Sequence, residues 1–278
     1  MQIPQIYKVL TIAGFDGSGG AGIQADLKTF SALGCYATTA LTALPVQNTT
    51  GVKSIYKIAK VCLEEQIVAI LEDMSLDAVK IGMLHRQEII KAVADLLKKY
   101  SIRNVILDPV MIAKSGDRLL VSQAILFMKK KLSPLITVLT PNLLEASELL
   151  ERKIESKNQM EKAALDLMQM GPQAVVLKGG HLNGACDDCL CFNKNNPKIY
   201  WFSSQRIHTQ NTHGTGCTFS AVITAFLAQG CTIYDSVKHA KHYLTKAIDA
   251  GKNLKIGQGN GPVHHFYDTW KHLRIYGS

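Results

Sequence analysis

Long apolar runs are missing from this chain of 278 residues, although 47% of the residues are hydrophobic. No stretch reaches the roughly 18 apolar residues that a membrane-spanning helix needs, so we expect no membrane partner. The first residues, Met1 to Gln5, have neither the basic region nor the cleavage site of a signal peptide. These absences predict a cytoplasmic protein, and the composition is that of a globular chain with a sizeable core.

A disulfide framework is also absent. The seven cysteines are an odd number in a long chain, which favours reduced thiols; they are Cys35, Cys62, Cys186, Cys189, Cys191, Cys217 and Cys231. The cluster from Cys186 to Cys191, with His181 nearby, could belong to a zinc site, but zinc usually takes four ligands in two spaced pairs. Strand alternation places Cys189 and Cys191 on one face, so we favour their packing as small hydrophobic side chains.

Charge of one sign is not concentrated in any long segment. The 31 Lys and Arg residues exceed the 22 Asp and Glu residues by 9, but they are dispersed. The longest basic run, residues 129–131, is typical of the solvated end of a helix. Since nucleic-acid binding needs a basic patch, we expect no nucleic-acid partner and consider a small anionic substrate the better explanation of the net charge.

A carboxylate is missing where a dinucleotide-binding protein would need one. The Gly-x-Gly-x-x-Gly pattern at residues 17–22 follows an expected strand at residues 8–13 and precedes an expected helix at residues 23–33. A dinucleotide fingerprint requires an acidic residue about 20 positions further on to bind the ribose, and residues 36–46 contain none. We therefore disfavour an oxidoreductase and interpret the loop as a wall that a substrate approaches closely.

Alternating strand and helix patterns make up most of the remaining sequence. The expected strands are residues 37–44, 78–81, 104–107, 136–139 and 174–177, and the expected helices are residues 64–73, 87–100, 122–132, 143–150, 160–170, 218–229 and 233–250. Short β patterns at residues 188–192, 199–202 and 206–208 indicate a small antiparallel edge. This order predicts one α/β domain over residues 1–278, with a mostly parallel central sheet and helices on both faces.

The helix expected at residues 218–229 is apolar almost all round and is therefore expected to be buried. Gly214 and Gly216 precede it, which leaves the backbone N–H groups of residues 214–217 free to converge on one point. Helix N-termini carry unpaired N–H groups and roughly half a positive charge, so we expect an anion to bind there. Cys217 lies at this entrance, where the pKa of a thiol is usually lowered.

Residues with chemical functions recur where the expected strands end, which is the edge at which parallel sheets bind ligands. Phosphoryl transfer needs a lysine for the phosphates, acidic groups for Mg²⁺ and donors for the transferred group. Lys178, Asp108 and Glu145 supply the first two, and the loop at residues 214–217 supplies the third. Other residues at these strand ends are Gly14, Asp16, Gln47, Met83, Val110 and Asn142.

The same segments resemble a known family. In chain order they are Thr11–Gly14, Asp16–Lys28, Val46–Thr49, Lys80–Leu84, Leu107–Met111, Thr140–Glu145, Lys178–His181 and Asn211–Thr218. Their order and spacing are similar to those of the hydroxymethylpyrimidine/phosphomethylpyrimidine kinases of thiamine biosynthesis, which belong to the ribokinase-like superfamily. The resemblance runs from about residue 8 to about residue 265 and implies a three-layer ribokinase-like fold.

The resemblance implies ATP-dependent phosphorylation of 4-amino-5-hydroxymethyl-2-methylpyrimidine at its hydroxymethyl group, and then of the monophosphate. It implies that Gln47 hydrogen-bonds the aminopyrimidine ring. The other implied substrate-side residues are Gly14, Asp16, Met83 and Val110. Cys217 would hold the catalytic position, with Gly214, Thr215 and Gly216 as the anion hole. The implied nucleotide-side residues are Asn142, Glu145, Lys178 and Thr215, and Asp108 and Glu145 would bind Mg²⁺.

The residues leave several alternatives open. A pyridoxine or pyridoxal kinase would also phosphorylate a hydroxymethylated nitrogen heterocycle, and a non-catalytic vitamin-binding protein could use the same scaffold. Cys217 could be a general base or could chiefly shape the anion hole, since phosphoryl transfer asks little of a base. Phe15 and Gly17 depart from the family pattern of a small residue and a proline beside the substrate loop. Superfamily members often form dimers, so we also consider a homodimer.

Overall fold

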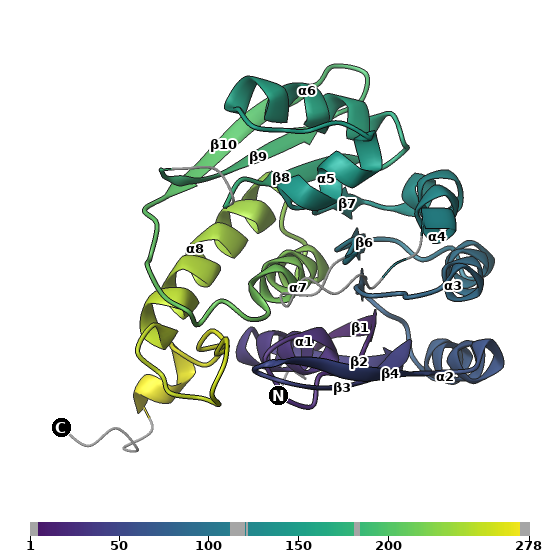
Figure 1. Cartoon of the computed structure of the whole chain (residues 1–278). Coiled ribbons are helices and arrows are strands. Elements are labelled where there is room, and N and C mark those ends of the chain that lie inside the picture. Colours follow the sequence, from purple (N-terminus) through teal and green to yellow (C-terminus); the bar gives the residue numbers. More distant parts are fainter. Residues whose placement is uncertain (1–4, 112–119, 121, 181–183, 273–278) are drawn as a thin grey trace.

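The computed structural model describes residues 5–111, 120, 122–180 and 184–272. Within them, a main sheet of eight strands has the order β10-β9-β8-β7-β6-β5-β1-β2 (Figure 1). The strands are β1 (Tyr7–Ala13), β2 (Cys35–Leu41), β5 (Ala78–Ile81), β6 (Val105–Leu107), β7 (Val138–Leu139), β8 (Ala174–Lys178), β9 (Cys186–Phe192) and β10 (Lys198–Ser204). Neighbouring strands from β2 to β8 pair in parallel, whereas β9 pairs antiparallel with both β8 and β10. The predicted mostly parallel sheet with an antiparallel edge is confirmed.

Helices cover both faces of the main sheet, which gives three layers (Figure 1). Those that form one core with the sheet are α2 (Lys60–Asp73), α3 (Gln87–Lys99), α4 (Ser122–Phe127), α5 (Leu143–Leu150) and α6 (Lys157–Met168). Those on the opposite face are α1 (Gly22–Ala32), α7 (Thr215–Ala228) and α8 (Ile233–Gly251). Helix α7 packs against α1, α8 and the central strands, which explains why its sequence is apolar almost all round. Among the described residues, no helix combines the length and apolar character that crossing a membrane requires.

A second sheet consists of β3 (Ala43–Asn48) and β4 (Gly51–Lys57), which pair antiparallel. The prediction of a single strand at residues 37–44 is wrong, because β2 ends before Thr42. The buried hydroxyl of Thr42 donates to the Met83 backbone oxygen at 2.6 Å. The Thr42 N–H still donates to the Ala13 backbone oxygen of β1 at 3.0 Å. After Thr42 the chain leaves the main sheet and forms the β3–β4 hairpin.

The cysteine cluster lies at the antiparallel edge of the main sheet. Cys189 and Cys191 are fully buried and belong to the core that α6 covers, as predicted for small hydrophobic side chains. All seven cysteines are described and are free thiols. In the described part of the chain, no group of three or more His, Cys, Asp or Glu side chains could together hold a metal ion. His181 lies outside the described residues.

Two expected segments differ in detail from the prediction. The helix expected at residues 122–132 is α-helical only to Phe127 and continues as a π-helix for five more residues. No strand forms at residues 206–208. There the Arg206 guanidinium donates to the Gly180 backbone oxygen at 2.9 Å, so this segment is held by a side chain rather than by strand pairing.

Candidate active site

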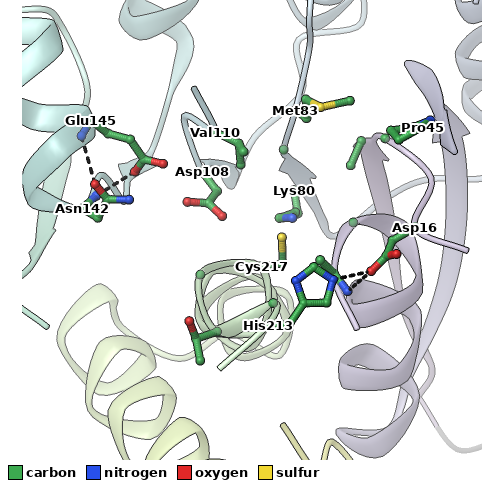
Figure 2. Close-up of a pocket in the computed structure, with 18 of the residues that line it drawn as sticks. Asp16, Pro45, Lys80, Met83, Asp108, Val110, Asn142, Glu145, His213 and Cys217 are labelled. Carbon is green, nitrogen blue, oxygen red and sulfur yellow. Dashed lines mark hydrogen bonds and ion pairs between the residues drawn. The ribbon is translucent and has the colours of Figure 1, made fainter. Parts of the chain in front are cut away.

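A pocket of about 430 Å³ opens where β1, β5, β6 and β8 end, against the start of α7 (Figure 2). It brings together all the residues that the sequence predicted for the site, namely Gly14, Asp16, Gln47, Met83, Asp108, Val110, Asn142, Glu145, Lys178, Gly214, Thr215, Gly216 and Cys217. A second pocket of about 310 Å³ shares five lining residues with the first, which are Asn142, Lys178, Thr212, Thr215 and Gly216. The start of α7 therefore stands between two cavities.

The backbone at the start of α7 is arranged as an anion site. Gly214 is the N-cap residue with a φ of 76°, and a Cβ there would clash with the Gly20 backbone oxygen, so glycine is required. The helix begins three residues earlier than predicted. Among the described residues, the N–H groups of Gly216 and Cys217 donate to no protein acceptor. Two free donors at a helix N-terminus on a pocket wall are suited to a phosphate group.

A lysine–carboxylate pair lies beside those donors. Lys178 Nζ donates to Asp108 Oδ1 at 2.8 Å, and the Asp108 side chain is only 2% exposed. A Cβ on Gly216 would lie 3.3 Å from Lys178 Nζ, so the pair adjoins the start of α7. Burial opposes the charge on Lys178, but the carboxylates of Asp108 and Glu145 outweigh it and raise the pKa of Lys178. The lysine therefore stays protonated.

Asn142 and Glu145 form a reciprocal capping box at the start of α5. Glu145 N–H donates to Asn142 Oδ1 at 2.9 Å, and Asn142 N–H donates to Glu145 Oε2 at 2.7 Å. Burial raises the pKa of Glu145 to about 7, while the Lys178 charge opposes this shift and the Asp108 charge adds to it. Because Mg²⁺ is commonly held by one or two carboxylates together with phosphate oxygens and water, Asp108 and Glu145 fit such an ion.

The Cys217 thiol lines the same wall, but its pKa is not lowered as its helix position predicted. Burial raises the pKa of Cys217 to about 11; the Lys80 ammonium opposes this shift and the Asp108 carboxylate adds to it. Desolvation of a thiolate outweighs the helix dipole, because the dipole contributes only about 1 kcal/mol. The thiol is therefore protonated at neutral pH and offers no ready thiolate base.

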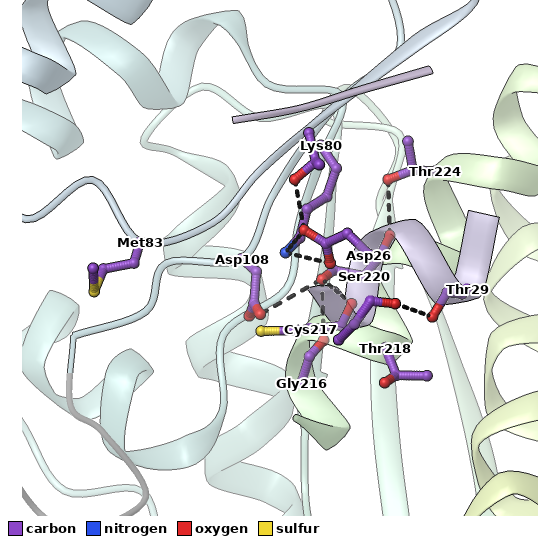
Figure 3. Close-up of polar contacts among 12 residues, drawn as sticks. Asp26, Thr29, Lys80, Met83, Asp108, Gly216, Cys217, Thr218, Ser220 and Thr224 are labelled. Atoms are coloured by element: carbon purple, nitrogen blue, oxygen red, sulfur yellow. Dashed lines mark hydrogen bonds and ion pairs between the residues drawn. The ribbon is translucent and has the colours of Figure 1, made fainter. Parts of the chain in front are cut away.

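Sequence reasoning assigned no role to a buried ion pair beside Cys217 (Figure 3). Lys80 Nζ donates to both carboxylate oxygens of Asp26 at 2.9 Å, and both side chains are 0% exposed. Thr11 Oγ1 also donates to Asp26 at 2.6 Å. Burial opposes the charge on Lys80, but Asp26 outweighs it and raises the pKa of Lys80. The sequence signal for this ion pair is a lysine inside the otherwise apolar strand β5, since a buried lysine needs an acidic partner.

The glycine-rich loop is organised around the carboxylate of Asp16. This carboxylate accepts hydrogen bonds from the N–H groups of Ser18, Gly20 and Ala21. His213 Nε2 lies 2.8 Å from Asp16 Oδ2, which joins the loop to the segment before α7 (Figure 2). Burial opposes the charge on Asp16, but the hydrogen bonds from His213 and Ser18 outweigh it, so the pKa of Asp16 lies well below its usual range. In the sequence, His213 stands out only as part of the segment before α7.

The remaining wall of the first pocket is largely apolar. A Cβ on Gly14 would lie 2.6 Å from Met83 Cε, so a side chain at this position would displace Met83. Gln47 reaches the pocket from a β-bulge in β3. Phe15 also lines the pocket, and its ring would lie 3.3 Å from a Cβ on Gly17. An apolar wall with one amide suits a flat heterocycle that has a polar edge.

The three-layer fold and this pocket define a ribokinase-like small-molecule kinase. The chain belongs to the phosphomethylpyrimidine kinase family, whose model matches residues 16–264. It is 45% identical over 262 residues to the hydroxymethylpyrimidine/phosphomethylpyrimidine kinase of Escherichia coli strain K12, with 94% of this chain and 98% of that protein covered.

Solved structures of two kinases share the fold. Phosphomethylpyrimidine kinase from Clostridium difficile 630 is 43% identical with a TM-score of 0.76, covering 87% of this chain and 99% of that one. Pyridoxal kinase from Staphylococcus aureus in complex with AMP-PCP and pyridoxal is 35% identical with a TM-score of 0.86, covering 96% of both chains. The chain is thus similar to kinases that are named for two different substrates.

Proposed function

We propose that this protein transfers the terminal phosphoryl group of ATP to the hydroxymethyl group of 4-amino-5-hydroxymethyl-2-methylpyrimidine, and then phosphorylates the resulting monophosphate. The family match and the names of the relatives support this substrate. The observation that carries the proposal is the shared wall of the two pockets, which includes Thr215 and Gly216. A pyrimidine in the first pocket and a nucleotide in the second would meet at this wall, which brings the reacting groups together.

Backbone N–H groups and one lysine would stabilise the transferred phosphoryl group. The N–H groups of Gly216 and Cys217 bind the transferred phosphoryl group, and the Lys178 ammonium neutralises charge that develops on it. The Gln47 amide offers both a donor and an acceptor to the aminopyrimidine edge. The protonated Cys217 thiol chiefly shapes the site, because a loose phosphoryl-transfer transition state needs little help from a base.

ATP and Mg²⁺ complete the proposed reaction. AMP-PCP, an analogue of ATP, is bound in the Staphylococcus aureus relative, which supports ATP as the phosphoryl donor. We place Asn142 and Thr215 on the nucleotide side and assign the metal to Asp108 and Glu145. When bound, Mg²⁺ would neutralise part of the negative charge on the phosphate oxygens of ATP. A single domain, a cytoplasmic location and a homodimer stay predictions.

Pyridoxal phosphorylation is the second candidate, because the Staphylococcus aureus pyridoxal kinase has the higher TM-score, 0.86 against 0.76. The polar edge that Gln47 presents favours the aminopyrimidine. A non-catalytic vitamin-binding protein would have no use for the free N–H groups beside the Lys178–Asp108 pair.

The test is to incubate the purified protein with Mg-ATP and either heterocycle, and then to identify the products by mass spectrometry. We expect the pyrimidine monophosphate and diphosphate, together with ADP. Phosphorylation of pyridoxal alone would establish the second candidate. Tight binding of either heterocycle without ADP formation would establish a non-catalytic protein.

A further inference from the structure

A glycine-rich segment near the C-terminal end, residues 257–262, lies against the β3–β4 turn; we call it the C-terminal strap. Glycines occupy alternate positions in it, at Gly257, Gly259 and Gly261. A Cβ on Gly257 would clash with the Thr49 side chain, and a Cβ on Gly259 would clash with the Thr49 backbone oxygen. The strap can therefore pack closely against this turn only because these positions lack side chains.

Two hydrogen bonds fasten the strap to the turn. Asn260 N–H donates to the Thr49 backbone oxygen at 2.9 Å, and Gly259 N–H donates to Thr49 Oγ1 at 3.1 Å. Thr49 follows the end of β3 and stands two residues after Gln47. The strap thus holds the backbone directly next to the side chain that we propose recognises the pyrimidine.

The β3–β4 hairpin buries little apolar surface near its turn. Every residue of β4 is exposed or half-buried, and in β3 only Ala43 and Pro45, at the start of the strand, are buried. Burial of apolar surface is the main stabilising contribution to a fold, and the segment around Gln47 lacks it. The hydrogen bonds from the strap therefore matter more here than they would at a buried strand.

The other end of the strap is joined to the segment before α7. His213 N–H donates to the Gly261 backbone oxygen at 3.0 Å, and His213 forms a β-bridge with Pro262. The Asn211 amide donates to the Gly251 backbone oxygen at 2.7 Å, and a Cβ on Gly261 would clash with Asn211 Oδ1. One short segment thus links the hairpin that carries Gln47 with the loop that forms the anion site.

We propose that Thr49 is a positioning residue, through which the C-terminal strap sets the place of Gln47 relative to the anion loop at residues 214–217. This inference rests on the proposed function. Thr49 does not line the first pocket but stands two residues after Gln47, so replacing its side chain should act on recognition of the heterocycle through Gln47. A small displacement of Gln47 is enough to matter, because hydrogen bonds weaken steeply when they are misaligned.

The test uses Thr49→Val, which removes the acceptor for Gly259 N–H and keeps the branched shape. We expect the KM for the pyrimidine to rise about fivefold, as the loss of one hydrogen bond predicts, with kcat and the KM for ATP nearly unchanged. Thr49→Ser keeps the hydroxyl and should keep the KM. Thr50→Val is the matched control, because the Thr50 hydroxyl donates to Asn48 within the turn, and it should also leave the KM unchanged.

The unmodified protein is assayed first, so that the two proposals can fail separately. If it is active and Thr49→Val has an unchanged KM, or a lowered kcat alone, the positioning role is overturned while the function stands. If it phosphorylates neither heterocycle, the function fails and amide hydrogen exchange of residues 43–57 tests the strap. Faster exchange in Thr49→Val than in Thr50→Val would support the positioning role, and equal exchange would overturn it.

Discussion

The ammonium group of Lys178 lies 2.8 Å from Asp108 Oδ1, although 70 residues separate the two in the sequence. Lys178 ends β8, Asp108 follows β6, and both lie close to Gly216 in the first turn of α7. Three distant segments thereby place a cation, a carboxylate and free backbone donors on one wall. A substitution at each of the three segments tests the cation, the carboxylate and the backbone donors separately.

Removing the Lys178 charge should impair catalysis. We expect Lys178→Met to lower kcat on the order of a hundredfold, because charge on the transferred group loses its neutralising partner. Steady-state kinetics with Mg-ATP and the pyrimidine measure this loss. Lys157→Met is the control, since Lys157 pairs with Asp187 at 2.5 Å outside both pockets, and its kcat should match that of the unmodified protein.

The double variant Lys178→Met/Asp108→Asn separates stability from catalysis. Asp108 is buried, so Lys178→Met alone leaves an unpaired carboxylate that lowers the free energy of unfolding by several kcal/mol, about 3–5. The second substitution should restore part of that stability, measured by urea unfolding, and none of the kcat. Recovery of kcat to near the unmodified value would show that Lys178 only compensates Asp108.

Side chains at Gly216 and Gly214 should have different effects. A Cβ at Gly216 would lie 3.4 Å from Asp108 Oδ2, so Gly216→Val should fold and crowd the anion site, lowering kcat on the order of a hundredfold. Gly214 has a φ of 76°, so Gly214→Ala should instead lower the free energy of unfolding by at least about 1–3 kcal/mol. Kinetics and urea unfolding of both variants provide the comparison, and equal stability losses would contradict this assignment.

The raised pKa of Cys217 predicts slow alkylation at neutral pH. Because the thiolate is the nucleophile, the rate with iodoacetamide should climb steadily as the pH approaches the Cys217 pKa of about 11. Peptide mass spectrometry follows individual thiols in one sample. Exposed Cys62 should react readily, and buried Cys189, whose pKa burial raises to about 12, should stay unmodified. A Cys217 rate that levels off near neutral pH would show that the helix dipole prevails.

Replacing the Lys80–Asp26 pair by apolar residues should preserve folding but raise the pKa of Cys217. Buried ion pairs are often replaced by well-packed apolar side chains without loss of stability, so Lys80→Met/Asp26→Leu should remain folded. Lys80→Met alone should lose about 3–5 kcal/mol, because Asp26 is left unpaired. The double variant removes the Lys80 charge, which lowers the pKa of Cys217, together with the weaker, opposite influence of the Asp26 carboxylate. Its alkylation profile should therefore shift to higher pH, and an unchanged profile would exclude this influence.

His265 should make the protein sensitive to acid. Burial lowers the pKa of His265 to about 3, from an ordinary value of 6.5. Below that ordinary value the unfolded chain binds a proton that the folded protein does not. His265 therefore contributes a decrease in the free energy of unfolding as the pH falls from 6.5 towards 3, by at most about 1.4 kcal/mol per pH unit. Glu145, whose pKa burial raises to about 7, contributes an opposite change as the pH falls to its ordinary value of 4.5. The difference between the slopes of the unmodified protein and His265→Gln, measured by urea unfolding between about pH 7 and about pH 5, gives the His265 contribution.

His265→Gln should remove the loss of stability that His265 causes as the pH falls, although it also removes the 3.1 Å contact between His265 Nε2 and Thr218 Oγ1. His242→Gln is the control, because His242 is exposed, and it should keep the slope. Parallel slopes for the unmodified protein and His265→Gln would show that another group causes the acid sensitivity.

Patterns within short segments were enough to predict most of the fold. Apolar runs located the buried strands, and the residues after them lie around one pocket because parallel strands end at a common edge. The break at Thr42 was missed, since its hydroxyl is anchored to the backbone of Met83, which follows a strand later in the sequence. The partner of Lys80 was missed for the same reason, because Asp26 lies 54 residues earlier.

The sequence by itself determined most of the order of strands and helices, the glycines before α7 and the family, because these depend on local patterns and spacing. The β3–β4 hairpin was not among them. The tertiary structure decided which charged groups are buried next to one another. It also decided the pKa of Cys217, in which burial outweighs the helix position. It also decided that residues 257–262 reach Thr49. Desolvation and long-range contacts depend on residues far apart in the chain, so no local pattern specifies them.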